Sequence, residues 1–239
     1  MQFIALVSIL IFSLSAAAER WVVATVEWPP YTCSKCYRNG AAAEALRQVL
    51  EKKGISIEFV FYPWIQTQKN GGKRSFVGYF PAWKDEILPG FSGAGPLFSS
   101  PLVFLEKRSK PLVWKTLDDL NGKTFAMTEG YGSTEEIARK VRRGDFKTIS
   151  VLSEESTLVK LAEGKVDGVL MDLNVGRYYL KNIFPQYQNK ISINPRIIVQ
   201  KDLFFAFNKH SKNKEEQFNE ALKATNFERI VDKYLKNVP

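Results

Sequence analysis

A strand–loop–helix unit occurs twice in this chain, once in each half, and this repetition constrains the fold more than any other feature. The first copy joins an apolar strand at residues 21–26 to a helix around residues 42–53. The second joins an apolar strand at residues 124–127 to a helix at residues 135–143. Open α/β sheets bind ligands at the carboxyl ends of their strands, where these loops lie. Two such units facing each other predict a clamp around a small solute.

The first eighteen residues are typical of an export signal. They carry no charged side chain, contain an apolar run at residues 4–14 and end on small residues at 15–18, which predicts cleavage after Ala18. The apolar run is too short to span a membrane comfortably. No cysteine stands at the cleavage point, so a lipid anchor is not indicated. We expect a soluble, exported protein that is periplasmic.

The net charge of +9 belongs entirely to the chain that follows this leader. A basic balance suggests anionic ligands or surfaces, and nucleic acid has to be considered. The lysines and arginines are scattered, however, and no dense basic stripe is interleaved with aromatic side chains. Solvated basic faces account for this pattern better than nucleic-acid binding, so we expect no nucleic-acid partner.

Cys33 and Cys36 form a lone C-x-x-C motif. In an exported chain, the default is a disulfide, which would stiffen the loop that carries Tyr31. A thioredoxin-like redox pair would sit at a helix N-terminus, whereas residues 37–40 separate this pair from the predicted helix. A zinc site needs two more ligands, which are not evident.

Apolar spacing divides the chain into two α/β halves. In the first half, a strand at 57–61 completes a βαβ unit, a third strand follows at 76–80, and residues 81–100 read as loop because they are rich in Gly and Pro. The second half continues with strands at 148–152 and 167–171. A helix at 157–163 lies between them.

The C-terminal segment contains a strand at 203–207 and a helical stretch at 215–235. Because it has no partner strand in the second half, we expect it to return to the first domain. Extended crossovers near 103–107 and 197–201 would then form a two-segment hinge. The predicted limits are residues 1–18 for the export signal, 19–105 plus 200–239 for the first lobe and 106–199 for the second.

Six short segments carry a resemblance to a known family, and their order and spacing span essentially the whole mature chain. They lie at residues 28–31, 62–64, 98–102, 117–123, 130–134 and 161–172. The chain resembles the periplasmic solute-binding proteins of the polar-amino-acid type that serve ABC importers (bacterial extracellular solute-binding protein family 3). The resemblance implies an α/β, type II-like periplasmic-binding-protein fold with two lobes, which closes on a small polar solute. It also implies a monomer without cofactor, metal or catalytic activity, and a membrane permease as its partner.

Aromatic side chains near the strand ends are candidates for the walls of the ligand cleft. The resemblance implies that Tyr31 stacks on the ligand, and Trp83 also lies in a loop at a strand end. Trp28, Trp64 and Tyr79 would complete the wall, because aromatic rings bury a large area at little entropic cost. For Trp64 and Tyr79, a place in the hydrophobic core is the alternative.

The second lobe contributes a helix start to the predicted site. Tyr131, Ser133 and Thr134 precede the helix at 135–143, where free N–H groups and the helix dipole favour an anionic group. The alternative is that Ser133 and Glu136 form an S-x-x-E capping box, which needs no ligand. Both roles are compatible.

Asp172 ends the predicted strand at 167–171. The resemblance implies that this carboxylate holds the α-ammonium group of the ligand, a hydrogen bond worth roughly 1.5–3 kcal/mol. The alternative is that Asp172 caps the following helix.

The sequence departs from the family pattern at one position. Relatives of this type grip the ligand carboxylate with an arginine, whereas Ile87 stands near that place here, and Lys84 is at most a point-charge substitute. The carboxylate of an α-amino acid thus lacks its usual partner. An amine, a peptide-like compound or an uncharged solute are the alternatives, and aromatic walls suit a cation.

Two other functions compete with solute delivery. An enzyme on the same scaffold would have to be a carboxylate-driven lyase using Glu129 or Asp172, because His210 is the only histidine and lies in a polar loop. No phosphate-binding loop or dinucleotide fingerprint is present. A sensor or adaptor that reports its ligand to a partner is the second alternative. We expect a binding protein and not an enzyme.

Overall fold

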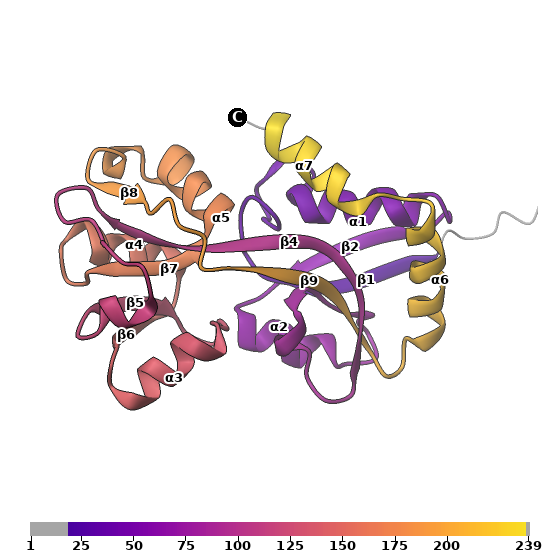
Figure 1. Ribbon diagram of the computed structural model, residues 1–239. Coiled ribbons are helices and arrows are strands. Elements are labelled where there is room, and N and C mark those ends of the chain that lie inside the picture. The colour runs from indigo at the N-terminus through magenta and orange to yellow at the C-terminus, as the bar shows by residue number, and fades with distance from the viewer. Residues whose placement is uncertain (1–18, 238–239) are drawn as a thin grey trace, which may run out of the picture.

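The computed structural model describes residues 19–237, which contain nine strands in one mixed sheet (Figure 1). The strands are β1 (Arg20–Thr25), β2 (Ser56–Phe61), β3 (Gly78–Trp83), β4 (Phe91–Lys107), β5 (Thr124–Thr128), β6 (Lys147–Val151), β7 (Gly168–Asp172), β8 (Ile191–Ile193) and β9 (Val199–Asn208). The α-helices are α1 (Ala41–Glu51), α2 (Trp64–Gly71), α3 (Glu135–Arg143), α4 (Glu154–Ala162), α5 (Leu173–Tyr178), α6 (Lys212–Lys223) and α7 (Phe227–Asn237). The sheet order is β2-β1-β3-β9-β4-β7-β5-β6, with β8 beside β4.

Two parallel α/β units are joined by two long strands. β1 pairs in parallel with β2 and β3, and β5 pairs in parallel with β6 and β7. β4 is antiparallel to β9 as far as Leu102 and antiparallel to β7 from that residue onward. Figure 1 shows β4 and β9 crossing side by side between the units. We call the unit with β1–β3, α1, α2, α6 and α7 the first lobe and the unit with β5–β8 and α3–α5 the second lobe.

Each lobe buries apolar side chains between its sheet and its helices. In α1, Ala42, Leu46 and Val49 are buried, at the spacing that predicted a one-sided helix. A large core cluster includes residues from both lobes, and a smaller one lies within the second. In that smaller cluster, Phe104 of β4 stacks on Phe125 of β5 with ring centroids 4.8 Å apart.

Most predicted elements are confirmed, with small shifts at their ends. The exception among the strands is the stretch 81–100, which the sequence predicted to be rich in loops. Residues 84–90 do lie outside strands, but the rest forms the end of β3 and the first half of β4. The two ladders shift register between Tyr79 and Ala82 and between Ala94 and Phe98. These irregularities accommodate Pro81 and Pro96, which cannot donate to a ladder, so the prolines mark bulges inside strands and not loops.

The predicted helix at 215–235 is two helices. α6 ends at Lys223, and α7 begins at Phe227. Asn226 accepts a hydrogen bond from the Arg229 N–H at 2.9 Å, so it caps a new helix at this point. α2 and β8 were not predicted, and α5 was anticipated only as the helix that Asp172 would cap.

Two sequence-based expectations concern the export signal and the limits of the lobes. The predicted export signal with cleavage after Ala18 lies outside the described residues. The predicted lobe limits, 19–105 plus 200–239 and 106–199, stay a prediction. Within residues 19–237, no helix has the length and apolarity needed to cross a bilayer.

Candidate functional site

A cavity of about 640 Å³ opens between the two lobes at the carboxyl ends of β1, β2, β5 and β6. Ligands bind at this edge of open α/β sheets, and the volume suits a small molecule. The first lobe contributes Val26, Glu27, Phe61, Tyr62, Pro63, Trp64, Ile65 and Gln66 to the wall. The second contributes Thr128, Glu129, Tyr131, Leu152, Ser153, Glu154, Glu155 and Tyr179.

Aromatic side chains fill the interior behind this cavity. Trp28 packs on Tyr31 with ring centroids 4.7 Å apart, and Trp64 meets Tyr131 edge-on at 6.5 Å. Two pockets of about 30 Å³ each lie between Trp28, Trp83 and Tyr131. Each is about large enough for a single water molecule. The room for a solute therefore lies in the outer cavity.

The Asp172 carboxylate is buried and already bonded by the protein. It accepts hydrogen bonds from Ser100 Oγ at 2.6 Å and from the N–H groups of Asn174 and Val175 at 2.7 and 2.9 Å. The Tyr31 hydroxyl lies 3.2 Å from Oδ1. Burial raises the pKa of Asp172 to about 6 in spite of these donors. Asp172 thus caps α5, the alternative that the sequence left open, and its role toward a ligand stays a prediction.

Tyr31 and Tyr79 do not line the cavity or the two small pockets. Tyr31 is fully buried, and its hydroxyl also accepts a hydrogen bond from Asn174 Nδ2 at 2.8 Å. Tyr79 is fully buried as well, and its hydroxyl donates to the carbonyl of Glu86 at 2.8 Å. The structure therefore places Tyr31 at a contact between the lobes and Tyr79 in the core, and not on the wall of the cavity.

Trp64, Trp83 and Tyr131, together with Trp28 in the small pockets, are the predicted aromatic residues that face open space. Trp64 lines the outer cavity, and Tyr131 lines the outer cavity and both small pockets. Trp83 lines only the small pockets, and Lys201 Nζ lies 4.2 Å from the centre of its ring. These three side chains form the boundary between the filled interior and the cavity.

Ser133 and Thr134 lie at the start of α3, outside the cavity lining. Thr134 is the N-cap and accepts a hydrogen bond from the Ile137 N–H at 3.1 Å. The predicted capping box of Ser133 and Glu136 is wrong by one residue. The Ser133 hydroxyl instead donates to the carbonyl of Thr134 at 3.3 Å. The carbonyl of Ser133 accepts a hydrogen bond from Lys201 Nζ at 3.3 Å.

Glu154 is the residue that the sequence analysis missed. It begins α4, lines both the outer cavity and one small pocket, and is only 6% exposed. Its Oε2 atom has no hydrogen-bond partner among the described residues. Burial, followed by the charges of Asp172 and Glu155, raises its pKa well above the ordinary value, and the Trp28 side chain, a donor toward this carboxyl group, only partly opposes the rise. In the sequence, Glu154 looks like an ordinary acidic residue in a helix first turn, so no signal marked it.

Glu86 connects the two lobes. Its carboxylate accepts hydrogen bonds from the Trp83 N–H at 3.0 Å and, across the lobes, from the Gly132 N–H at 3.1 Å. Burial raises the pKa of Glu86 to about 7. A Cβ atom on Gly132 would lie 3.1 Å from the Trp83 ring, so a glycine permits this close approach.

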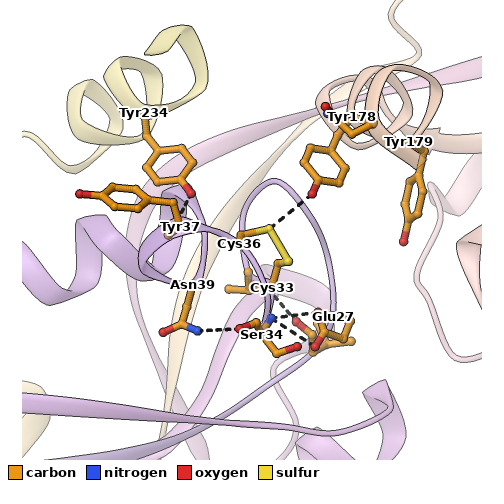
Figure 2. The surroundings of a disulfide bond; sticks show 12 residues. Glu27, Cys33, Ser34, Cys36, Tyr37, Asn39, Tyr178, Tyr179 and Tyr234 are labelled. Atoms are coloured by element: carbon orange, nitrogen blue, oxygen red, sulfur yellow. Dashed lines mark hydrogen bonds between the residues drawn. A yellow bond between two sulfur atoms is a disulfide. The ribbon is translucent and has the colours of Figure 1, made fainter. Parts of the chain in front are cut away.

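The predicted disulfide between Cys33 and Cys36 is confirmed, and it lies beside the second lobe (Figure 2). The Tyr178 hydroxyl of α5 is 3.6 Å from Cys36 Sγ. On the other side of the loop, the Ser34 N–H lies 3.1 Å from a carboxylate oxygen of Glu27, a residue of the cavity wall. The disulfide loop thus holds Glu27 in place and contacts the opposite lobe.

The charge of the cavity wall is one-sided. Its charged side chains are Glu27, Glu129, Glu154 and Glu155, and no Lys, Arg or His lines it. Lys84 is exposed and outside the wall, so it does not replace the missing arginine. Ile87 packs against the core next to Gly93. No group of three or more metal-ligating side chains occurs within residues 19–237.

Solved structures of ligand-binding domains are similar to this chain. The GluR0 ligand-binding core from Nostoc punctiforme in complex with L-glutamate is 21% identical with a TM-score of 0.68, covering 90% of this chain and 98% of that chain. A histidine kinase sensor domain with similarity to periplasmic binding proteins is 19% identical with a TM-score of 0.76, covering 91% and 97%. An ancestral arginine-binding protein bound to arginine is 18% identical with a TM-score of 0.75, covering 90% and 97%.

No protein-family model matches the sequence, and no curated protein sequence matches it. At the identities of the structural matches, the likeness concerns the fold and not the ligand. The likeness extends over about nine tenths of the chain in both of the matches with the higher TM-scores. The chain has the two-lobed α/β fold of periplasmic-binding-protein-like domains, as its sequence predicted.

Proposed function

We propose that the chain is an exported solute-binding protein that closes its two lobes around a small molecule. The observation that carries this proposal is the cavity of about 640 Å³ between the lobes, which contains the buried, unpartnered carboxylate oxygen of Glu154. Similar structures support it, since one is a GluR0 ligand-binding core with L-glutamate and another an arginine-binding protein with arginine.

Hydrogen bonds between the lobes stabilise the closed form. Tyr31 bonds Asp172 and Asn174, and Glu86 bonds Gly132. These hydrogen bonds exist only while the lobes lie together. A solute that touches both walls of the cavity adds to them and shifts the population toward the closed form. The closed form is the species that a membrane partner would recognise.

We propose that the protein is a periplasmic monomer that delivers its solute to the permease of an ABC importer. A sensor role is the second candidate, because a histidine kinase sensor domain matches 91% of the chain with a TM-score of 0.76. Deleting the gene separates the two roles. An importer component is needed for uptake of the labelled solute, whereas a sensor is needed only for the cellular response to it.

A solute screen tests binding itself. The purified protein is unfolded and refolded to remove any carried-over solute, then heated with amino acids, amines, short peptides, sugars and organic acids. A ligand that binds the native state raises the melting temperature with increasing concentration. Small-angle scattering should then show a smaller radius of gyration for the bound protein. If no solute in the panel raises the melting temperature of the well-folded protein, the proposed function is wrong.

A further inference from the structure

Glu154 has a buried carboxylate oxygen that lacks a hydrogen-bond donor. Its side chain is only 6% exposed, its Oε2 atom has no partner among the described residues, and it lines the cavity. A buried carboxylate oxygen without a partner is unfavourable, and the cost is highest when the group is ionised. A ligand that brings an N–H donor, and above all a positively charged one, relieves this cost.

The other charged groups of the cavity also favour a positively charged ligand. Glu27, Glu129 and Glu155 also line it, and no basic side chain does, although the chain as a whole carries a net charge of +9. A cavity lined with charges of one sign concentrates solutes of the opposite sign. A ligand carboxylate would meet four acidic side chains and no cationic partner. The N-terminus of α4 is a poor partner for a ligand carboxylate, because the Ser156 N–H already donates to Ser153 Oγ at 3.3 Å.

The remaining wall suits an apolar body on the ligand. Tyr62, Trp64, Tyr131 and Tyr179 supply aromatic surface, which attracts cations through the faces of the rings. At the rim, one exposed apolar side chain comes from each lobe. Ile65 is 59% exposed and Leu152 is 87% exposed.

Building on the proposed function, we propose that this cavity binds a small organic cation without a carboxylate, an amine or guanidinium compound with an apolar body. Its charged group donates to Glu154 Oε2, and its body lies between the aromatic side chains of the two lobes. In this proposal the cation contacts Glu154 and not Asp172, which does not line the outer cavity and already accepts hydrogen bonds from Ser100, Asn174, Val175 and Tyr31.

Two matched pairs of probes test the proposal. Agmatine and L-arginine differ only in the α-carboxylate, and so do tyramine and L-tyrosine. The refolded protein is titrated calorimetrically with each, and with L-glutamate as an acidic control. We expect the decarboxylated member of at least one pair to bind about tenfold or more tightly than its amino acid, the effect of one charged contact.

Glu154→Gln supplies the second arm of the test. It keeps the size of the side chain but removes the charge, and we expect it to weaken binding of the same amine by about tenfold or more. Glu163→Gln is the matched control. Glu163 is exposed at the far end of α4 and pairs with Lys165, so affinity should be unchanged.

The outcomes separate the two proposals. If L-arginine and L-tyrosine bind as tightly as agmatine and tyramine, or if Glu154→Gln binds amines as the wild type does, the cation proposal is wrong and solute binding stands. If only acids, sugars or neutral solutes bind, the cation proposal is also wrong and solute binding stands. A hit from another amine in the screen that depends on Glu154 supports the proposal. If nothing binds, both proposals fail.

Discussion

The hydroxyl of Tyr31 and the carboxylate of Asp172 meet between the two lobes, with 3.2 Å between the Tyr31 oxygen and Asp172 Oδ1. Tyr31 belongs to the loop after β1 and Asp172 to the end of β7, so the contact joins residues 141 positions apart. Asn174 Nδ2 donates to the same hydroxyl. This pair therefore holds the lobes together in the arrangement described here, and the ligand does not have to supply the bond.

Asp172→Ala should destabilise the protein as well as affect closure. The substitution removes the cap of α5 and leaves the Ser100 and Tyr31 hydroxyls without their acceptor. We expect the free energy of unfolding to fall by about 2–4 kcal/mol, measured by urea denaturation without ligand. Asp202→Ala, at an exposed site, should change it little. An unaltered melting temperature for Asp172→Ala would show that these hydrogen bonds do not hold the fold.

The raised pKa of Glu86 predicts an unusual dependence of stability on pH. Because burial raises its pKa from 4.5 to about 7, the folded protein binds more protons than the unfolded chain in that interval. The stability that Glu86 contributes is therefore greatest at low pH and declines as the pH rises through about 7. Asp172 acts in the same direction, since burial raises its pKa to about 6. Lys201 and Asp85 are the charges that face Glu86, and they oppose each other.

Urea denaturation at about pH 5 and about pH 8 measures this effect, and the wild type should be less stable at the higher pH. Glu86→Gln should show a shallower decline, even if the lost acceptor lowers its stability at every pH. Equal slopes for the two proteins would mean that Glu86 titrates normally. Glu216→Gln, at an exposed site on α6, should retain the slope of the wild type.

Binding of a cation should release a proton from Glu154. Burial and the charges of Asp172 and Glu155 raise its pKa, and the phenols of Tyr131 and Tyr179 face the same space. A bound cation favours the ionised carboxylate, so its pKa falls on binding and affinity rises with pH. Titration calorimetry in two buffers of different ionisation enthalpy should detect the released proton. The effect should disappear in Glu154→Gln, and proton uptake would contradict it.

Gly132→Ala should favour separation of the lobes. The added Cβ would lie 3.1 Å from the Trp83 ring and 3.3 Å from Glu86 Oε1, which is tighter than ordinary contact. We expect a larger radius of gyration by small-angle scattering and an affinity that falls by about fivefold to 150-fold, since small steric insertions cost about 1–3 kcal/mol. Gly72→Ala is the control, because its Cβ would meet its neighbours no closer than 3.4 Å. An unchanged radius for Gly132→Ala would mean that the loop adjusts locally.

The sequence predicted many of the helices and strands well because their apolar residues recur with a clear period. β1, α1 and β2 form the βαβ unit that the apolar spacing indicated. The errors occur where tertiary contacts override a local signal. Pro81 and Pro96 suggested a loop, yet the ladder accommodates both at register shifts.

The candidate site was harder to predict because it depends on which side chains are buried. The burial of a single side chain cannot be predicted from its neighbours in the sequence. Nothing near Glu154 distinguishes it from the exposed acidic residues that often begin helices. Tyr31 and Tyr79 have the chemistry of ligand-stacking residues, but both are fully buried. Which way such a ring faces depends on how two lobes pack against each other, so Trp64 and Tyr79 looked equivalent in the sequence.

The rim formed by Ile65 and Leu152 gives the cavity different selectivity at its two ends. Leu152 is 87% exposed, so the mouth is open to solvent, whereas the Glu154 end abuts aromatic side chains with only water-sized gaps. A substituent added at the ammonium end has nowhere to go, but one added at the opposite end extends into water. A series of primary 1-aminoalkanes should therefore lose little affinity as the chain lengthens, whereas N-alkylation should abolish binding. The affinity would then depend on the ammonium group of the ligand and hardly on the length of its alkyl chain.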